Sequence, residues 1–256
     1  MIGLTNMYFN YKKKINDIDA MLMAAGKGKR MRHFTKFMAK PLIKINKISI
    51  LERNIIKVAN TGIKKIVINT SYQHLTIKKF IKNFKSRKKL PKIIVTFEKN
   101  RLETGGGLKN AIEKFENSNL LVINGDSILK NDFRNCPIKT LYSNYKKKNM
   151  DVLLLLSKKK NTFGYHGNGD YSKLSCSSAS RLTTKSSQVS QKYIFTGWQI
   201  INKRILNNFA EKTFSLKKVY DLAERNGRLY GVVHLGDFFH IGDTKSYGII
   251  NKLYKL

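Results

Sequence analysis

The sequence predicts an α/β fold built on a doubly wound, mostly parallel β-sheet. Short apolar runs typical of buried strands alternate along the chain with segments of helical periodicity. This alternation is typical of parallel sheets covered by helices on both faces. The chain has 256 residues, enough for one large domain with a hydrophobic core. We therefore expect residues 1–18 to form a weakly ordered N-terminal extension and residues 19–256 to form a single domain.

The predicted elements follow one another in the order that this fold requires. The first strand begins at Ala20, and a helix over residues 48–60 ends before Gly62. Further strands are expected at residues 66–68, 93–97, 120–123, 151–156, 193–201 and 229–235, and further helices at residues 75–84, 105–115, 216–225 and from about 244. Residues 158–190 are polar, rich in Ser, Lys and Gly, and almost without periodicity, so we expect a mobile hairpin region there.

The first strand runs directly into a glycine-rich basic bend, Gly26-Lys27-Gly28-Lys29-Arg30. Backbone N–H groups and cations at the end of a strand can bind phosphate. The spacing lacks the third glycine of the dinucleotide fingerprint and the Gly-Lys-Ser/Thr ending of the P-loop. Taken alone, the bend is therefore equally compatible with a glycine turn that carries solvated lysines.

The net charge is unusually high, at +34, from 50 Lys and Arg against 16 Asp and Glu. Such a charge attracts anions of every kind, including nucleic acid and anionic membranes. The lysines are scattered through every predicted helix and do not form one stripe with interleaved aromatic residues. We therefore expect no specific nucleic-acid partner and interpret the charge as compositional drift that still helps to recruit a polyanionic nucleotide.

No apolar run approaches the ~20 residues needed to cross a bilayer, so no membrane span is expected. Residues 1–17 lack a long apolar segment and a small-residue cleavage site, and are not a good signal peptide. Cys136 and Cys176 are far apart and match no metal-binding spacing. A reducing cytoplasm is therefore the expected location. The oligomeric state is left open.

Four further motifs follow the bend in the chain: Lys40-Pro41-Leu42, Leu102-Glu103-Thr104-Gly105-Gly106-Gly107, Val122-Ile123-Asn124-Gly125-Asp126 and Phe195-Thr196-Gly197. In this order they resemble the sugar-phosphate nucleotidyltransferases, which make a nucleoside-diphosphate sugar and pyrophosphate from a sugar 1-phosphate and a nucleoside triphosphate. They look most like the branch that acts on N-acetylmuramate 1-phosphate with UTP for cell-wall recycling, with the mannose-1-phosphate guanylyltransferase branch as nearest neighbour. The resemblance runs from about Asp19 to the C-terminus and implies a Rossmann-like mixed sheet of the nucleotide-diphospho-sugar transferase type.

The resemblance also implies roles for individual residues. Arg30, Lys40 and Asp126 are expected to carry the chemistry, with Lys40 at the phosphates and Asp126 on Mg²⁺. The residues expected at the nucleotide are Ala24, Ala25, Gly26, Gly28, Arg30, Thr104, Gly105 and Gly106. The residues expected at the sugar are Glu103, Asn124, Gly167 and Gly197.

Several of these residues also have a purely structural interpretation. Arg30 can be a surface cation, Lys40 a solvated lysine before a turn proline, and Asp126 a turn residue after Asn-Gly. Thr104 can cap a helix whose glycines permit the turn, which is compatible with a role at the nucleotide. Gly197 can occupy a bulge or a tight contact.

One position departs from the family pattern. The second metal-binding aspartate that the family usually has near its C-terminus is replaced by His240, and Asp243 stands where threonine is expected. Imidazole is a poor Mg²⁺ ligand. Either His240 contacts phosphate and the ion is held by Asp126, nucleotide oxygens and water, or Asp243 or Asp237 supplies a carboxylate, or the protein is a catalytically weak nucleotide-binding homologue. We favour the first of these.

The implied reaction is attack of a sugar phosphate oxygen on the α-phosphorus of the triphosphate. The attacking oxygen is already an anion, so the site needs no general base or covalent nucleophile, only donors and cations that hold two polyanions in line. The prediction therefore depends on geometry: the bend from Gly26 to Arg30 and the carboxylate of Asp126 must face one cleft.

Overall fold

The computed structural model describes residues 14–85, 90–132, 136–146, 149–184 and 192–254. Within them the strands form a nine-stranded sheet, a three-stranded sheet and a two-stranded sheet. In spatial order the large sheet contains β10 (Ser172–Lys173), β11 (Ala179–Thr183), β13 (Leu229–Val233), β8 (Val152–Ser157), β12 (Ile194–Asn202), β6 (Asn119–Asn124), β1 (Asp19–Met23), β4 (Lys65–Thr70) and β5 (Lys92–Phe97). The small sheets contain β7 (Ser127–Leu129), β14 (Phe238–His240) and β9 (Thr162–Phe163), and β2 (Lys44–Ile45) and β3 (Ile48–Ser49).

The α-helices are α1 (Ile50–Ala59), α2 (His74–Lys85), α3 (Glu103–Asn110), α4 (Pro137–Asn144), α5 (Leu216–Arg225) and α6 (Thr244–Leu253). The 3-10 helices are η2 (Lys29–Thr35), η3 (Lys40–Leu42), η4 (Ile112–Lys114), η5 (Lys159–Asn161) and η6 (Lys203–Asn208). Among the described residues, no helix combines the length and the apolar character needed to cross a membrane.

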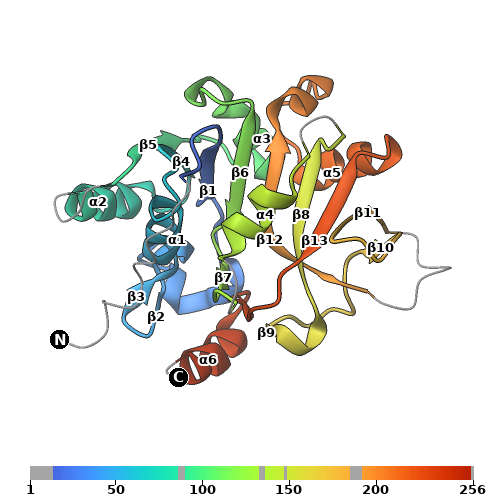
Figure 1. The fold of residues 1–256 in the computed structure, drawn as a ribbon. Coiled ribbons are helices and arrows are strands. Elements are labelled where there is room, and N and C mark those ends of the chain that lie inside the picture. The colour runs from blue at the N-terminus through green and yellow to red at the C-terminus, as the bar shows by residue number, and fades with distance from the viewer. Residues whose placement is uncertain (1–13, 86–89, 133–135, 147–148, 185–191, 255–256) are drawn as a thin grey trace.

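The large sheet has a parallel half and a mixed half (Figure 1). β5, β4, β1 and β6 run parallel, with Met21 of β1 opposite Val67 of β4 and Val122 of β6. β12 is antiparallel to both β6 and β8, and β11 pairs antiparallel with β13 and β10. The Rossmann-like mixed sheet is thus confirmed, but "mostly parallel" describes only one half. A connection as short as that between β10 and β11 cannot make a parallel crossover.

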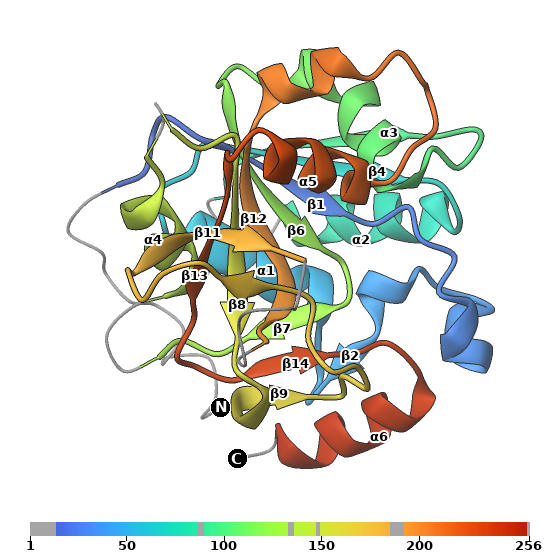
Figure 2. The same ribbon diagram turned by 90° about the vertical axis from the view of Figure 1, so that its right-hand side faces the viewer.

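Helices cover both faces of the sheet, as a doubly wound fold requires. Side chains alternate along β1, so Ala20 and Leu22 face one side and Met21 and Met23 face the other. α1, α2 and α4 pack on the first side, and α3 and α5 pack on the second (Figure 1, Figure 2). Every residue of β1 is consequently buried, as expected of a central strand covered on both faces.

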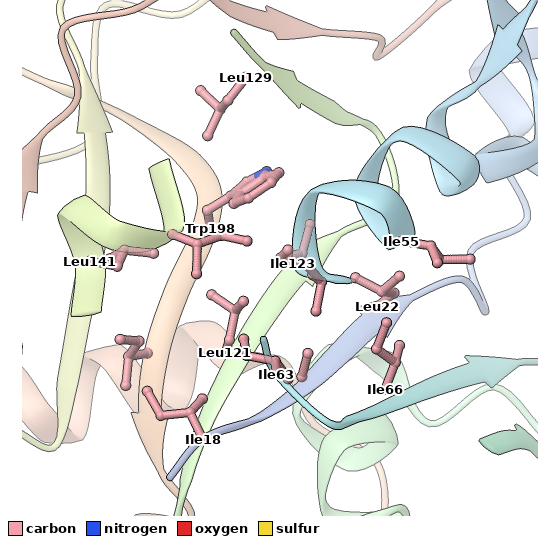
Figure 3. Close-up of a cluster of buried hydrophobic side chains, with 14 of the residues drawn as sticks. Ile18, Leu22, Ile55, Ile63, Ile66, Leu121, Ile123, Leu129, Leu141 and Trp198 are labelled. Atoms are coloured by element: carbon pink, nitrogen blue, oxygen red, sulfur yellow. The ribbon is translucent and has the colours of Figure 1, made fainter. Parts of the chain in front are cut away.

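The larger core lies between the sheet and the helices α1 and α4. Trp198 of β12 is fully buried and lies between these two helices (Figure 3). Its indole N–H donates to Ser127 Oγ at 3.0 Å, so the one polar atom of the ring is satisfied. Relative to alanine, a buried tryptophan stabilises a fold by about 3–5 kcal/mol. Around it the core includes Leu22, Ile55, Ile66, Leu121, Ile123 and Leu141.

A separate apolar cluster joins α6 to the three-stranded sheet. Ile250 of α6 packs with Ile128 of β7 and Phe239 of β14, and the rings of Phe163 and Phe239 stack with their centroids 5.1 Å apart. Figure 2 shows α6 and β9, β14 and β7 together below the large sheet. This cluster holds residues 238–240 beside the end of β6.

Most predicted elements are confirmed. The expected strands correspond to β1, β4, β5, β6, β8, β12 and β13, and the expected helices to α1, α2, α5 and α6. The helix predicted over residues 105–115 is wrong in extent, because α3 ends at Asn110 and a 3-10 turn follows. The elements α4, β7 and β14 were not predicted from the sequence, and the region expected to be a hairpin without periodicity contains β9, β10 and β11.

The expected N-terminal extension is described only in part. Residues 1–13 lie outside the described residues. Ile15 and Ile18 are buried in the larger core, and the Ile15 N–H donates to the carbonyl oxygen of Thr61 at 3.0 Å.

Candidate active site

The carboxyl ends of β1, β4, β5 and β6 surround a cavity of about 360 Å³, which we call the first cavity. Its lining residues are Met23, Ala24, Ala25, Gly26, Lys27, Gly28, Lys29, Arg30, Lys40, Pro41, Asn69, Glu98, Arg101, Glu103, Thr104, Asn124, Gly125, Asp126 and Gly242. The structure therefore brings the bend from Gly26 to Arg30 and the turn at Asp126 to one cleft. Five cations face three carboxylates around it, which favours a polyanionic ligand.

The glycine-rich bend owes its shape chiefly to Gly28. This residue has φ +62, and a Cβ there would lie 2.8 Å from Thr35 Cγ2 and 3.1 Å from Lys40 Cβ. Its carbonyl oxygen accepts a hydrogen bond from the Met31 N–H at 2.8 Å, which starts η2. Apart from Gly26 and its two chain neighbours, no described residue has an atom within 4 Å of the position that a Cβ at Gly26 would take, so the backbone there is open to a ligand.

Two buried polar residues tie three strand ends together beneath the bend. Asn69 Oδ1 accepts from the Ala24 N–H at 3.0 Å, and Asn69 Nδ2 donates to Glu98 Oε1 at 2.7 Å. Glu98 Oε2 also accepts from the Leu102 N–H at 3.3 Å. Both polar residues are about 2% exposed, and both line the cavity. Sequence reasoning missed them, although each stands at the carboxyl end of an apolar strand, the position that identified Asp126.

Asp126 lies between Lys40 and His240. Lys40 Nζ is 2.8 Å from Asp126 Oδ2, and His240 Nε2 is 3.7 Å from the same oxygen. The side chains of Lys40 and Asp126 are 11% and 28% exposed. Burial by itself would raise the pKa of Asp126, but the charge of Lys40 and the nearby imidazole of His240 outweigh it and hold that pKa well below the usual range. The carboxylate is therefore ionised throughout the physiological pH range.

The turn that carries Asp126 is fixed on both sides. A Cβ at Gly125 would collide with the carbonyl oxygen of Met23, so glycine is required where β6 passes the end of β1. On the other side, the antiparallel pairing of β14 with β7 sets His240 opposite Ser127. The turn is thus held between Met23 of β1 and His240 of β14.

A second cavity of about 500 Å³ adjoins the first. Its lining residues are Asn124, Asp126, Tyr165, Gly169, Asp170, Tyr171, Thr184, Phe195, Thr196, Gly197, Lys217, Tyr220, Phe238 and His240. Asn124 and Asp126 line both cavities and mark their junction. Burial and then the charge of Asp170 raise the pKa of Tyr165 to about 12, and burial also raises the pKa values of Tyr171 and Tyr220. The second cavity therefore combines aromatic surfaces with neutral phenol hydroxyls.

Gly197 occupies both a bulge and a tight contact in the wall of the second cavity. It has φ +80, and the register between β12 and β8 shifts between Phe195 and Gln199. A Cβ at this position would lie 2.8 Å from Asn124 Cβ. The structural interpretation of Gly197 is therefore correct, and its place in the cavity wall leaves a role at the sugar open.

Two residues expected at the sugar, Gly167 and Glu103, do not line the second cavity. Gly167 lines neither cavity, and Gly169 takes a place in the second cavity instead. Glu103 lines the first cavity only and has φ +60. The positive φ of Gly169, +104, explains why glycine stands at that place in the irregular segment.

The structure places Gly105 and Gly106, which were expected at the nucleotide, away from the first cavity. Both are buried in α3 and neither lines the first cavity. Their N–H groups donate to the carbonyl oxygen of Phe214, at 2.8 and 3.0 Å, and are not free for phosphate. A Cβ at Gly106 would collide with the carbonyl oxygen of Lys212, and one at Gly105 with the Phe214 ring. These glycines serve the close packing of α3 against the segment before α5.

Thr104 lines the first cavity, but it does not cap α3. The N-cap position of α3 is Leu102, and no side chain makes a capping hydrogen bond there. Thr104 Oγ1 instead accepts from the Leu216 N–H at 2.9 Å, at the start of α5. The hydroxyl thus links two helices at the rim of the cavity.

The protein atoms fit a Mg²⁺ ion that has one protein carboxylate. Among the described residues, no group of three or more His, Cys, Asp or Glu side chains could hold a metal. Asp243 caps α6, where its Oδ1 accepts from the Ser246 N–H at 2.8 Å, and neither Asp243 nor Asp237 lines either cavity. Mg²⁺ in phosphate-transfer sites is commonly bound by one or two carboxylates together with substrate phosphates and water. Asp126 can meet that requirement without a second carboxylate.

Comparison with known proteins identifies the family. The family described as "Nucleotidyl transferase" matches residues 19–248. The N-acetylmuramate alpha-1-phosphate uridylyltransferase of Caulobacter vibrioides is 25% identical over 228 residues, which cover 89% of this chain and 93% of that protein. The D-glycero-alpha-D-manno-heptose 1-phosphate guanylyltransferase of Campylobacter jejuni is 28% identical over 233 residues, which cover 90% and 97% of the two chains.

The fold is shared with solved structures. HddC from Yersinia pseudotuberculosis, complexed with GMP-PN, aligns with a TM-score of 0.71 at 22% identity, over 92% of this chain and 99% of that chain. The family match covers nearly the whole chain and agrees with the motifs at the strand ends. The chain therefore belongs to the nucleotidyl transferase family, which confirms both the family and the class of enzyme that its motifs predicted.

Proposed function

We propose that this enzyme transfers a uridylyl group from UTP to N-acetylmuramate 1-phosphate and releases pyrophosphate. One observation carries the proposal: two cavities, one rich in cations and one rich in aromatic side chains, meet at Asn124 and Asp126. A triphosphate suits the first cavity, and a sugar, which stacks on aromatic rings and hydrogen-bonds to phenols, suits the second. The reacting phosphates would then meet at the junction.

In the proposed reaction, a phosphate oxygen of the sugar 1-phosphate forms a bond to the α-phosphorus of UTP. The bond from that phosphorus to the bridging oxygen of the leaving pyrophosphate breaks. Both the attacking and the leaving groups are anions at neutral pH, so no proton has to be transferred. The task of the protein is to align two polyanions and to offset their charge.

The residues of the first cavity have the chemistry for this task. Arg30 offers several N–H donors in one plane, suited to the oxygens of a phosphate. Lys27 and Lys29 add charge on the same side of the cavity, and Lys40 stands at the junction beside Asp126. In this proposal Lys40 stabilises the charge that develops on the phosphates.

Mg²⁺ is part of the proposal, with Asp126 as its protein ligand. When bound, the ion would neutralise charge on the phosphate oxygens. The His240 side chain lines the second cavity beside Asp126, where its Nε2 would contact a phosphate oxygen of the bound substrate.

The identity of the two substrates is the most specific part of the proposal. The name of the Caulobacter relative supports UTP and N-acetylmuramate 1-phosphate, and with them a role in cell-wall recycling. The name of the Campylobacter relative supports a second candidate, guanylyl transfer to a manno-configured sugar 1-phosphate. We also propose a cytoplasmic location, which agrees with two free cysteines at Cys136 and Cys176.

A panel of reactions tests these candidates. Purified protein is given UTP, GTP, dTTP or CTP with each of several sugar 1-phosphates, with and without Mg²⁺, and pyrophosphate release is measured. Release that is highest with UTP and N-acetylmuramate 1-phosphate is the expected result, whereas a preference for GTP would favour the second candidate. Asp126→Ala should be inactive, and Glu211→Ala, which removes a carboxylate that is 51% exposed, serves as the matched control.

A further inference from the structure

A third hollow, of about 270 Å³, borders the glycine-rich bend, and we call it the outer hollow. Its lining residues are Lys27, Lys29, Arg32, Thr35, Lys36 and Tyr72. Four of these six side chains are cationic and none is acidic. Among the described residues, no ion pair links any of the four cations to a carboxylate.

The walls of the outer hollow are held in place by hydrogen bonds. The Thr35 hydroxyl lies 3.1 Å from the carbonyl oxygen of Gly28 and 3.2 Å from that of Arg32, and it donates toward both. On the opposite side, Gln73 Nε2 donates to the carbonyl oxygen of Lys36 at 2.9 Å, which ties η2 to the segment after β4. The hollow is therefore part of the folded chain and not a gap between loosely packed loops.

The backbone at Arg32 is unusual. Its φ of 47 and ψ of −118 interrupt η2 and lie in a region that non-glycine residues rarely occupy. Such a conformation costs on the order of 1–3 kcal/mol, and it persists only where the surroundings impose it, often at ligand sites. Here it places a guanidinium-bearing residue in the wall of the outer hollow beside Lys36.

Four like charges around one small hollow repel one another unless an anion joins them. A surface hollow of this size is smaller than the roughly 300–1,000 Å³ of cavities that hold drug-sized ligands. A compact anion with several charges fits both observations, and arginine and lysine are the residues that bind phosphate oxygens.

We propose that the outer hollow is a binding site for an inorganic oligophosphate, such as pyrophosphate or tripolyphosphate, separate from the first cavity. Lys27 and Lys29 line both, so the bend forms a shared wall between the two. The site does not depend on the proposed reaction, because the argument uses only the charges and shape of the outer hollow.

Isothermal titration calorimetry with inorganic tripolyphosphate tests the proposal at 0.15 M salt, where the Debye length of about 8 Å screens the diffuse field of the chain. The wild-type protein should bind one equivalent in the outer hollow, in addition to any that the first cavity binds. Arg32→Gln combined with Lys36→Gln should lose the outer equivalent or weaken it at least tenfold, while circular dichroism shows an unchanged fold. Neither residue lines the first cavity.

Lys78→Gln combined with Lys82→Gln is the matched control, because it removes the same charge from α2, away from the outer hollow. This control should bind as many equivalents as the wild type. No binding by the wild type, no loss of an equivalent in the Arg32 and Lys36 variant, or an equal loss in the control would each overturn the proposal. Failure of the proposed reaction would appear only in pyrophosphate release and would leave this binding measurement intact.

Discussion

Replacing Lys40 with methionine and Asp126 with asparagine, singly and together, tests the ion pair at the junction of the two cavities. The pair spans 2.8 Å, with side chains that are 11% and 28% exposed. Exposed pairs contribute about 0–1 kcal/mol, and breaking a fully buried pair costs about 3–5 kcal/mol. For this partly buried pair we expect a coupling energy of about 2 kcal/mol in the double-mutant cycle.

The same contacts give the pH range in which the pair stabilises the fold. Lys40 and His240 hold the folded-state pKa of Asp126 below its ordinary value of 3.8, against the opposing effect of burial. The stabilisation is therefore complete at pH 7 and falls only as the pH drops below about 3.8. Free energies of unfolding in urea should be measured at pH 7 for the four proteins of the cycle.

A second ion pair in the chain serves as the control, because it has the same N–O distance but more exposed side chains. Lys217 and Asp221 on α5 are also 2.8 Å apart, but their side chains are 70% and 42% exposed. Their coupling should be about 0.3–0.5 kcal/mol, as for other helical pairs four residues apart. If the cycle at Lys40 and Asp126 gives no larger coupling than this control pair, the argument from burial is refuted.

Asp126→Ala is expected to reduce Mg²⁺-dependent pyrophosphate release at least ~100-fold, whereas unchanged activity would disprove its role at the ion. His240→Asp adds a second carboxylate and should lower the Mg²⁺ concentration that gives half the maximal rate; no change would mean that this side chain does not face the ion. Gly197→Ala forces a Cβ onto a residue with φ +80 in the wall of the second cavity, so the KM for the sugar 1-phosphate should rise more than that for the triphosphate, and an equal rise would count against the assignment of that cavity. Burial holds the pKa of His234 below 6.5, so the unfolded chain takes up the proton first and the free energy of unfolding should fall as the pH drops below 6.5, by up to about 1.4 kcal/mol per pH unit; an equal slope in His234→Gln would exclude this residue as the cause.

The residues of the site that could be predicted from the sequence are those at the carboxyl ends of the strands. The apolar runs that became β1 and β6 located the bend at Gly26 and the acid at Asp126, because parallel strands bring their carboxyl ends to one edge. Asn69 and Glu98 obey the same rule, and a search for polar residues at the ends of apolar strands would have found them. Their importance shows only in the hydrogen bonds that join β1, β4 and β5.

The parts that sequence reasoning missed depend on contacts between distant segments. The glycine-rich pattern at Gly105 and Gly106 predicts a ligand-binding loop. Their packing partners, Lys212 and Phe214, lie more than a hundred residues away in the sequence. β7 and β14 are three residues each and exist because Phe238 pairs with Leu129. Local pattern cannot reveal such short strands, since each is stabilised only by its partner.

His240 is placed at the junction by that same long-range pairing. Its Nδ1 lies 3.3 Å from the carbonyl oxygen of Gly164, so a proton on Nδ1 can donate there, and Nε2 is directed toward Asp126. An aspartate at this position would give the junction two carboxylates to one lysine. With His240 the charge of Asp126 is already offset by Lys40, 2.8 Å away.

This difference in charge has opposite effects on the two kinds of ligand. A junction with one paired carboxylate repels incoming phosphates less than a junction with two, so it favours the approach of two polyanions. The same junction attracts a divalent cation less strongly, because one carboxylate and not two would bind it. Neutralisation of the phosphate charge would then depend less on the ion and more on the cations of the chain that line the first cavity: Lys27, Lys29, Arg30 and Lys40. In the proposed reaction, the imidazole of His240 and the excess of basic residues would therefore act in the same direction: both would make phosphate binding depend more on the protein and less on the metal.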